Sequence, residues 1–467
     1  MRILLVWPSQ PHIISPPHMK AIQEGLGNLP PIGLICLATW LHERSEHQAE
    51  VLDALLEGMS PEEVARHAVA TEAQAVGLSG MTHTWMDCLL VIRAIRAVAP
   101  QLPIILGGPQ ATLFPLESLE HSEVDYVVVG DGEVPLTSLL DRLAQGRQDT
   151  EGLPGVLRRG DPVGARYFHP DMADLPIPDR SLTPWRRYAS VVSRHPPTTV
   201  VMSSRGCPYR CSFCSTAGGK KFRANPAQRV VDELESCVDL GIREFLFFDE
   251  LFTFDRSRVL EICRQIRERG LEVFWDVRSR VDRVDPEMLR AMAEAGCQRV
   301  QYGIESGTER VLGLYTKGIT LEQARQAVRW TREAGISTYA DFMIGAPGET
   351  REEVLETLRF AHSLDLDFVH FSITMLLPQT PLYAQALRQG LLSRDVWREY
   401  VLEPTGDFHP PYWEEVLDAS ELEAMLRRAI HSFYFSPRFL WRSLTSLRSP
   451  GELLRKARAG LKLALGL

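Results

Sequence analysis

The chain contains 467 residues, 45% of them hydrophobic and 24% charged, and carries a formal net charge of −9 at pH 7. This length exceeds what one ordinary hydrophobic core contains, so we expect two or three domains. The composition excludes a disordered or fibrous protein, and the negative charge gives no electrostatic reason to expect nucleic-acid binding.

The start of the chain, MRILLVWPSQ, predicts a strand and lacks the longer apolar core and cleavage site of a signal peptide. No apolar run reaches the roughly 18 residues of a membrane-spanning helix, so we expect a cytoplasmic protein. Eight cysteines in a long cytosolic chain do not indicate a disulfide framework. Five of them are expected to be small buried apolar side chains: Cys36, Cys88, Cys237, Cys263 and Cys297.

Residues 1–145 alternate short apolar runs with helical stretches. The apolar runs lie at 2–8, 49–58, 75–81, 103–109 and 124–133, and the helical stretches at 30–44, 61–70, 85–100 and 134–146. About five such units predict a parallel, doubly wound, Rossmann-like sheet. Ligands of these sheets bind beyond the carboxyl ends of the strands.

The alternation stops between residues 146 and 198, where we place the domain boundary. Residues 151–170 are typical of a hairpin, and the proline-rich stretch 174–185 of a connector.

A second alternating series occupies residues 199–382. Strands are expected at 198–204, 244–250, 272–278, 299–306, 337–345 and 368–376, with helical stretches at 226–241, 256–270, 285–296, 320–335 and 350–364. Six repeats suit a partial (β/α)6 barrel with its chemistry at the carboxyl ends of the strands, although an open sheet fits the same pattern. The remainder, 383–467, is expected to be mostly helical.

Three cysteines follow the first strand of this series in the pattern C-x3-C-x2-C: Cys207, Cys211 and Cys214. A closed zinc site needs four ligands, which His195 could complete. Alternatively, three thiolates hold three irons of a four-iron cluster and leave the fourth iron open to bind and activate a ligand.

This loop resembles the cluster motif of radical S-adenosylmethionine (SAM) enzymes. Four later stretches, at 245–255, 296–307, 342–350 and 376–383, are similar to successive motifs of the subgroup shared with methylthiotransferases and Elongator-type enzymes. The resemblance implies a [4Fe-4S] cluster whose open iron binds the amino and carboxylate groups of SAM. One electron from the reduced cluster would then cleave SAM to a 5′-deoxyadenosyl radical.

The resemblance also implies SAM contacts. The backbone of Phe213 would meet the adenine, and Asp249 and Glu250, which end the second strand, would accept hydrogen bonds from the ammonium group. Glu305 and Ser306 would lie near the ribose and carboxylate.

In the same way, Gly345 and Gly348 would let the backbone approach the adenine. For the acidic residues, the alternative is helix capping or a solvated loop.

The amino-terminal domain resembles the cobalamin-binding domain found ahead of such barrels, which often carries D-x-H-x-x-G, S-x-L and a glycine pair. Asp53 and Gly58 occupy the outer positions of the first motif, but Leu55 replaces the histidine. This implies base-off cobalamin without a histidine ligand from position 55. The later elements correspond to Ser79 and Met81, followed by the pair Gly107–Gly108.

His83 and Trp85 are candidates for the lower cobalt face, His83 as a ligand and Trp85 as an apolar lid. The GDGE stretch resembles a recurring loop of these domains: Gly130 and Gly132 suit a tight turn near a bulky ligand, and Glu133 also suits a helix start. The alternatives are ordinary packing for the two side chains, and a domain that keeps the fold without binding a corrinoid.

The carboxyl-terminal region is basic. From His431 onward, seven cations stand against the single acid Glu452: Arg438, Arg442, Arg448, Arg455, Lys456, Arg458 and Lys462. A basic amphipathic helix suits peripheral contact with an anionic membrane or an anionic substrate. It also suits a helix packed on the barrel with its cations in water.

These resemblances point to a cobalamin-dependent radical SAM enzyme of the group that contains class B methyltransferases and the anaerobic magnesium-protoporphyrin monomethyl ester cyclase. The main expectation is methylation of an unactivated carbon of a small-molecule or lipid-like substrate through the radical and methylcobalamin, with an electron donor such as flavodoxin or ferredoxin. Oxidative cyclisation or rearrangement without methyl transfer is the alternative.

Two further hypotheses are weaker. Transfer RNA methylthiolation would require a cysteine-rich amino-terminal domain, which Cys36 and Cys88 do not supply. A non-catalytic iron–sulfur or corrinoid-binding protein would show an intact cluster but no SAM cleavage.

Overall fold

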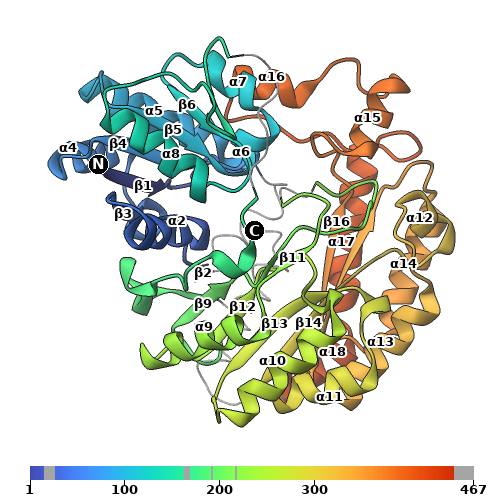
Figure 1. The fold of residues 1–467 in the computed structure, drawn as a ribbon. Helices are drawn as coiled ribbons and strands as arrows, with labels where there is room; N and C mark the ends of the chain where they lie inside the picture. The colour runs from blue at the N-terminus through green and yellow to red at the C-terminus, as the bar shows by residue number, and fades with distance from the viewer. Residues whose placement is uncertain (15–26, 162–168, 191–192, 216–217, 446–467) are drawn as a thin grey trace.

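The computed structural model describes residues 1–14, 27–161, 169–190, 193–215 and 218–445 (Figure 1). Two six-stranded sheets form the two halves of the molecule. Within the described part of the chain, we find no helix with the length and hydrophobicity to cross a membrane.

The amino-terminal sheet is doubly wound, as expected. Its strands occur in the order β3-β1-β4-β5-β6-β7, and all pairs except the last are parallel. The strands are β1 (Arg2–Trp7), β3 (Gln48–Asp53), β4 (Ala75–Ser79), β5 (Ile104–Gly107), β6 (Tyr126–Val128) and β7 (Val156–Arg158). Order and direction therefore confirm the Rossmann-like prediction.

Helices cover both faces of this sheet. Helices α2 (Ile32–Arg44) and α8 (Glu133–Ala144) pack on one face, and α4 (Pro61–Ala70) and α5 (Trp85–Val98) on the other. Strand β1 shows why: Ile3 and Leu5 point into one core, and Leu4 and Val6 into the other. A strand buried on both faces must be apolar throughout, which explains the run ILLV.

The hairpin predicted for residues 151–170 lies partly outside the described residues, so only its first part can be placed. Val156–Arg158 adds to β6 as an antiparallel edge strand, while residues 162–168 lie outside the described chain. Val156 and Leu157 are buried in the two cores of the sheet. This strand covers an edge of β6 that would otherwise present unpaired backbone groups.

The second sheet is a parallel wall whose strands follow chain order, β16-β15-β14-β13-β12-β9. The strands are β9 (Thr198–Val201), β12 (Glu244–Phe247), β13 (Phe274–Ser279), β14 (Cys297–Glu305), β15 (Ser337–Ile344) and β16 (Phe368–Ile373). The first and last strands do not pair in the described chain, so the wall is the partial barrel that we expected (Figure 1).

Helices line the outer side of the wall. They are α9 (Ala227–Asp239), α10 (Arg256–Glu268), α11 (Pro286–Glu294), α12 (Glu309–Leu314), α13 (Leu321–Glu333) and α14 (Arg351–Ser363). Alternate strand residues such as Val300, Tyr302 and Phe342 are buried beneath this layer, and the residues between them are half-buried on the inner side. In (β/α) barrels the chemistry takes place at the carboxyl ends of the strands.

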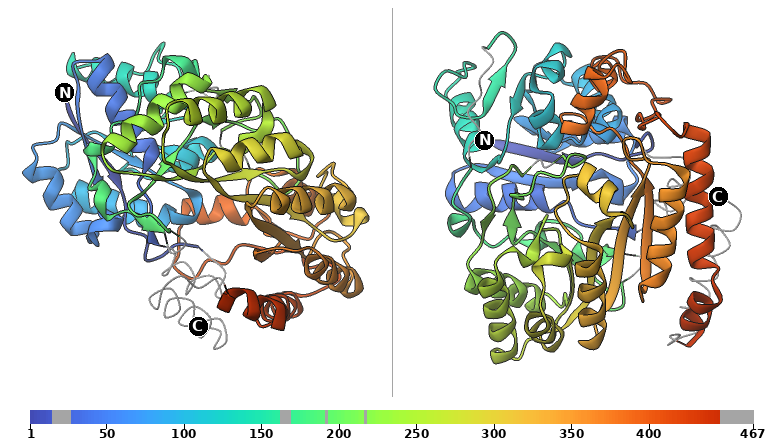
Figure 2. Two further views of the ribbon diagram at one scale, coloured as in Figure 1. Left: turned by 90° about the horizontal axis from the view of Figure 1, so that it is seen from below. Right: turned by 90° about the vertical axis from the view of Figure 1, so that its right-hand side faces the viewer.

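The carboxyl-terminal helices divide between the two halves. Helices α15 (Pro381–Arg388) and α16 (Val396–Leu402) contribute Leu382, Tyr383 and Trp397 to a core shared with the amino-terminal sheet. Helix α17 (Ala419–Tyr434) runs along β16 at the edge of the barrel (Figure 2). The described part of the carboxyl-terminal region, up to residue 445, therefore packs against both halves.

The basic tail is only partly described. Arg438 and Arg442 of α18 (Pro437–Thr445) bind the Asp365 carboxylate at 2.6 and 2.8 Å. These two cations pack onto the barrel, which agrees with the packing interpretation of the region. The remaining basic residues of the tail lie outside the described residues.

Candidate active site

The cysteine loop is fixed at its base. It leaves β10 (Ser204–Arg205) through Gly206, where φ is +85° and a Cβ would lie 2.3 Å from the Lys221 carbonyl oxygen. Only glycine permits this approach. The Glu250 carboxylate accepts the Gly206 N–H at 3.1 Å, and the Cys207 N–H donates to the Gly219 carbonyl.

The three thiols form no disulfides with described residues, and the charges of Cys211 and Cys207 affect the pKa of Cys214. Burial and the neighbouring Cys211 and Cys207 together raise the pKa of Cys214 to about 11, against the opposing effect of Lys220 and Lys317. Among the described residues, no three thiol, imidazole or carboxylate groups stand as a preassembled ion site. The donor set still fits an iron–sulfur cluster, because iron deprotonates thiols and two ammonium groups would offset the resulting negative charge.

His195 does not complete a zinc site. It precedes β9, at the amino ends of the strands, and its ring stacks on Phe274 with centroids 3.7 Å apart. The cysteines follow β9 at the opposite end of the wall, so the four-residue strand of about 13 Å separates them from this imidazole. The zinc alternative with His195 is therefore wrong.

Asp249 is a structural carboxylate and not an exposed ligand. Its side chain is completely buried and accepts hydrogen bonds from the Ser203 N–H, the Ser203 hydroxyl and the Ser204 hydroxyl at 2.6–2.7 Å. It thereby fixes the segment that leads into the cysteine loop, and the predicted contact with the SAM ammonium group is not available to it. Glu250 is exposed and supports the same loop through Gly206.

A buried ion pair lies beside the loop. Glu305 accepts a hydrogen bond from Lys317 Nζ at 2.8 Å, and this nitrogen lies 5.9 Å from the centre of the Phe213 ring. Glu305 has φ of +75° where the β14–β15 register shifts, so a bulge redirects its side chain. Burial raises the pKa of Glu305, and Lys317 opposes that shift.

Sequence reasoning missed two cations here. One is Lys317, and the other is Arg280, which follows β13. The guanidinium of Arg280 lies 3.6 Å from the centre of the Tyr209 ring in the cysteine loop. It also donates a hydrogen bond to the Lys317 carbonyl at 2.7 Å. Its remaining terminal nitrogen is buried and finds no partner among the described residues. The position of Arg280 at a strand's carboxyl end was the one available signal.

Ser306 and Gly345 face the protein's interior. Ser306 is completely buried, with its hydroxyl 3.2 Å from that of Thr357, so it presents no surface to a ligand. Gly345 has φ of +84°, and a Cβ there would lie 2.9 Å from Leu422 of α17. These two predicted SAM contacts instead hold α14 and α17 on the barrel.

Gly348 differs from Gly345 because nearly open space surrounds it. Its φ is +59°, and the nearest atom to a Cβ would be in Arg310 at 4.0 Å. Directly after Gly348 stands Glu349, which the sequence prediction missed: its carboxylate accepts the N–H groups of Gly345 and Ala346 at 2.6 and 2.8 Å. Burial raises the pKa of Glu349 to about 7.

On the amino-terminal side, the D-x-x-x-x-G pattern forms one helical turn, α3 (Ala54–Glu57). The Asp53 carboxylate caps it by accepting the Leu56 N–H at 3.0 Å, and Gly58 ends it with φ of +67°. Leu55 is half-buried within this turn. The outer residues of the motif are thus needed for the turn itself, whatever stands at the histidine position.

The ends of β4 and β5 come together as predicted. The Gly80 N–H donates to the Gly107 carbonyl at 3.0 Å. At Gly108, where α6 (Gly108–Leu113) begins with φ of +83°, a Cβ would lie 2.8 Å from the Ser79 hydroxyl oxygen. At Gly107, by contrast, a Cβ would fit without a clash, since the nearest atom, the Leu78 carbonyl oxygen, would lie at 3.9 Å.

Met81, His83 and Trp85 have different environments. Met81 and His83 are half-buried, and burial lowers the pKa of His83, which favours a neutral imidazole. Trp85 is completely buried, and its indole N–H donates to the Val401 carbonyl at 2.9 Å. Trp85 therefore belongs to the core between α5 and α16 and presents no surface to a corrin.

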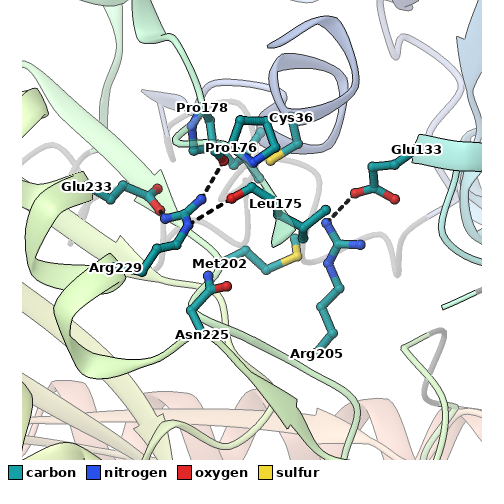
Figure 3. A pocket seen from close by; sticks show the side chains of 11 residues that line it. Cys36, Glu133, Leu175, Pro176, Pro178, Met202, Arg205, Asn225, Arg229 and Glu233 are labelled. Atoms are coloured by element: carbon teal, nitrogen blue, oxygen red, sulfur yellow. Dashed lines mark hydrogen bonds and ion pairs between the residues drawn. The ribbon is translucent and has the colours of Figure 1, made fainter. Parts of the chain in front are cut away.

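The GDGE loop connects the two halves of the molecule. Gly130 has φ of +81°, and a Cβ at Gly132 would lie 3.1 Å from Leu37 of α2. Glu133 begins α8 but turns toward the barrel, where it accepts a hydrogen bond from Arg205 at 2.7 Å (Figure 3). The carboxyl ends of β6 and β9 thus meet, two residues before Cys207.

The inner face of the barrel carries a polar network. Asp341 accepts hydrogen bonds from Gln301 Nε2 at 2.8 and 3.0 Å and lies 3.4 Å from His370 Nδ1. Asp276 and Arg299 form a second pair, joined at 3.0 Å through Nε. These half-buried groups supply hydrogen-bond donors and acceptors on the side of the sheet opposite the helices α9 to α14.

The chain is similar to known proteins over both halves. Residues 201–361 match the Radical SAM superfamily, and residues 21–140 match the B12 binding domain. The chain is 32% identical to the uncharacterised methyltransferase PH0819 of Pyrococcus horikoshii, covering 96% of this chain and 97% of that protein. It is 28% identical to the anaerobic magnesium-protoporphyrin IX monomethyl ester cyclase of Cereibacter sphaeroides over 82% of this chain and 63% of that protein.

A solved structure supports the same architecture. The radical SAM methyltransferase TsrM of Kitasatospora setae, with cobalamin and a [4Fe-4S] cluster bound, superimposes with a TM-score of 0.69 at 24% identity, covering 83% of this chain and 78% of that one. At this identity the likeness shows the fold. Together with the near full-length match to the Pyrococcus protein, the two domains and the cysteine loop between them show that this chain belongs to the cobalamin-dependent radical SAM methyltransferase family.

Proposed function

We propose that this enzyme methylates an unactivated carbon of a small-molecule or lipid-like substrate. The observation that carries the proposal is the junction of Glu133 with Arg205, which brings the corrinoid-side loop against the cysteine loop. When bound, the reduced cluster and SAM supply a 5′-deoxyadenosyl radical, and cobalamin supplies the methyl group.

The chain's own residues define where these groups would be held. Cys207, Cys211 and Cys214 would bind three irons. Lys317 and the unpartnered nitrogen of Arg280 offer cations to the SAM carboxylate, and the open Gly348 admits the adenine. The substrate would lie on the inner face of the barrel, near Gln301, Asp341 and His370.

The cobalamin would bind at the carboxyl edge of the amino-terminal sheet, over Ser79 and Gly107. Leu55 cannot ligate cobalt, so we infer a base-off corrinoid without a histidine from that position. His83 remains the candidate beneath the cobalt, because a neutral imidazole can act as a ligand or hydrogen-bond acceptor.

Anaerobic incubation with methyl-labelled SAM and a reductant tests the methyl transfer. We expect label in the product together with 5′-deoxyadenosine. Deoxyadenosine with an altered but unlabelled product would favour radical cyclisation or rearrangement, which the similarity to the Cereibacter cyclase supports as the second candidate.

Candidate substrates for this assay are lipids, tetrapyrroles and natural-product precursors. We further propose a cytoplasmic enzyme that takes electrons from a flavodoxin or ferredoxin and needs no nucleic acid. Contact of its basic carboxyl terminus with a membrane surface is testable by co-sedimentation with anionic vesicles.

A further inference from the structure

A charged network spans the junction between the two halves. Arg205 and Arg223 stand opposite each other on the antiparallel pair β10–β11 (Arg223–Ala224). Arg205 binds Asp131 at 2.9 Å and Glu133 at 2.7 Å, and Arg223 binds Asp131 at 2.7 Å. One guanidinium therefore holds both acids of the GDGE loop.

This network is withdrawn from water. The side chains of Arg205 and Asp131 are 12% and 13% exposed, and that of Glu133 is 3% exposed. Burial alone would lower the pKa of Arg205, but Glu133 and Asp131 raise it above its ordinary value. Burial alone would raise the pKa of Asp131, but Arg205, His169 and Arg223 hold it below its ordinary value.

A small cavity adjoins the network (Figure 3). It measures about 20 Å³ and is lined by Glu133, Arg205 and Asn225, with Cys36 and Met202 beside them. Each of the three polar side chains has a buried atom with no hydrogen-bond partner in the part of the chain that the structure describes: Glu133 Oε2, Arg205 Nε and Asn225 Oδ1. This volume suits roughly one water molecule, which would complete their hydrogen bonds.

The segment from Arg205 to the first cysteine, Cys207, is short and conformationally restricted. One residue separates Arg205 from Cys207, and that residue, Gly206, is held by Glu250 through its N–H and by a backbone approach that admits no side chain. A displacement of the GDGE loop would therefore move the cysteine loop with it.

We propose that Arg205 is a positioning residue that fixes the cysteine loop to the GDGE loop and so sets the separation of the two cofactors. The inference rests on the proposed function, because it presumes that both cofactors bind. The buried, planar guanidinium of Arg205 binds two carboxylates at once, and the single ammonium group of a lysine cannot reproduce this geometry.

The separation can be measured by pulsed electron paramagnetic resonance between the reduced cluster and cob(II)alamin, in full-length protein loaded with hydroxocobalamin and reduced. We expect one narrow distance distribution for the unchanged enzyme. R205Q should broaden this distance distribution, and R205K should give a width between those of R205Q and the unchanged enzyme. Equal widths for R205Q and the unchanged enzyme, with both cofactors bound, would overturn the proposal.

R187Q is the matched control. Arg187 also makes an ion pair to the amino-terminal half, with Glu57 at 2.5 Å, but its side chain is 50% exposed. R187Q should leave the distance distribution unchanged, because an exposed ion pair contributes little to stability. If R205Q does not fold, D131N removes one carboxylate from the other side of the junction and should broaden the distribution too.

Hydrogen exchange tests the role of Arg205 independently of the proposed function. Without added cofactors, R205Q should speed exchange of the amides in 206–215 by about tenfold relative to R187Q, through local opening. Unchanged exchange would overturn the proposal. An unchanged enzyme that binds no cobalamin would refute the proposed function and leave this exchange test to decide the role of Arg205.

Discussion

Glu349 is a single buried carboxyl group with two backbone donors. The N–H groups of Gly345 and Ala346 donate to Oε2, whereas Oε1 is buried and has no partner within the described segments. Burial raises the pKa of Glu349 from 4.5 to about 7. The folded protein therefore retains this proton at pH values where the unfolded chain has lost it.

The stability of the enzyme should accordingly fall as pH rises from about 4.5 to 7, by about 3 kcal/mol from this group alone. E349Q keeps the carbonyl acceptor and removes the titration, so its free energy of unfolding should vary less over this range. Urea unfolding at several pH values measures the difference. Identical pH profiles for E349Q and the unchanged enzyme would contradict the assignment.

Cys211 is the most buried of the three loop thiols, at 8% exposure. C211A should abolish cluster assembly and SAM cleavage, because two thiolates do not replace three iron ligands. Iron and sulfide analysis and the assay for 5′-deoxyadenosine measure the loss. C263A is the control: Cys263 is buried in the barrel core, so its loss should cost about 1 kcal/mol of stability and no iron. SAM cleavage by C211A would refute the cluster assignment.

At the scale of elements, loops at the carboxyl ends of the strands carry the site. Gly108 shows how closely two of them approach, because a Cβ there would lie 2.8 Å from the Ser79 hydroxyl and 2.9 Å from the Gly80 carbonyl oxygen. A larger residue must push the end of β4 away from α6. The consequence should be confined to the corrinoid side, since the cysteine loop belongs to the other sheet.

G108W should therefore lose cobalamin binding while it retains the iron–sulfur cluster, and G108A should weaken cobalamin binding. Absorbance spectra of the reconstituted protein with hydroxocobalamin measure both cofactors. G146A is matched in backbone strain, with φ of +73°, but has open space around its Cβ position. It should bind cobalamin normally. A G108W protein with unchanged cobalamin affinity would argue against this binding edge.

At the scale of the whole molecule, the segment that follows the barrel packs into a hydrophobic core of the amino-terminal half. Trp397 of α16 is 2% exposed and packs in the same cluster as Val6 and Trp85 of the amino-terminal half. Its indole donates to the Leu376 carbonyl, just after the last barrel strand. The chain that leaves the barrel is thus part of the first domain's core.

We expect the two halves to unfold in a single calorimetric transition. W397A should lower the stability of that transition by about 3–5 kcal/mol through the cavity it leaves. W441A makes the same change at a side chain that is 70% exposed and should have little effect. Two separate transitions, of which W397A shifts only one, would show that the halves fold independently.

The helices and strands could be predicted because the burial of one face or of both faces of an element requires a regular pattern of apolar residues close together in the sequence. β1 is apolar throughout, and β14 and β15 alternate buried with half-buried residues, so both sheets were foreseen. The internal contacts of Asp249, Ser306 and Trp85 could not be predicted, for a common reason. Their partners Ser203, Thr357 and Val401 come from other segments, and no local pattern reveals such contacts.

The sequence by itself determined the strand–helix order, the three-thiol loop and the absence of a histidine at Leu55, because each depends on residue identity and short spacing. Only the tertiary structure decided how the halves meet. Arg205 and Glu133 are 72 residues apart in the chain, and their pairing depends on the placement of two sheets. Burial then makes that contact specific, because an unpaired charge at the junction would be costly.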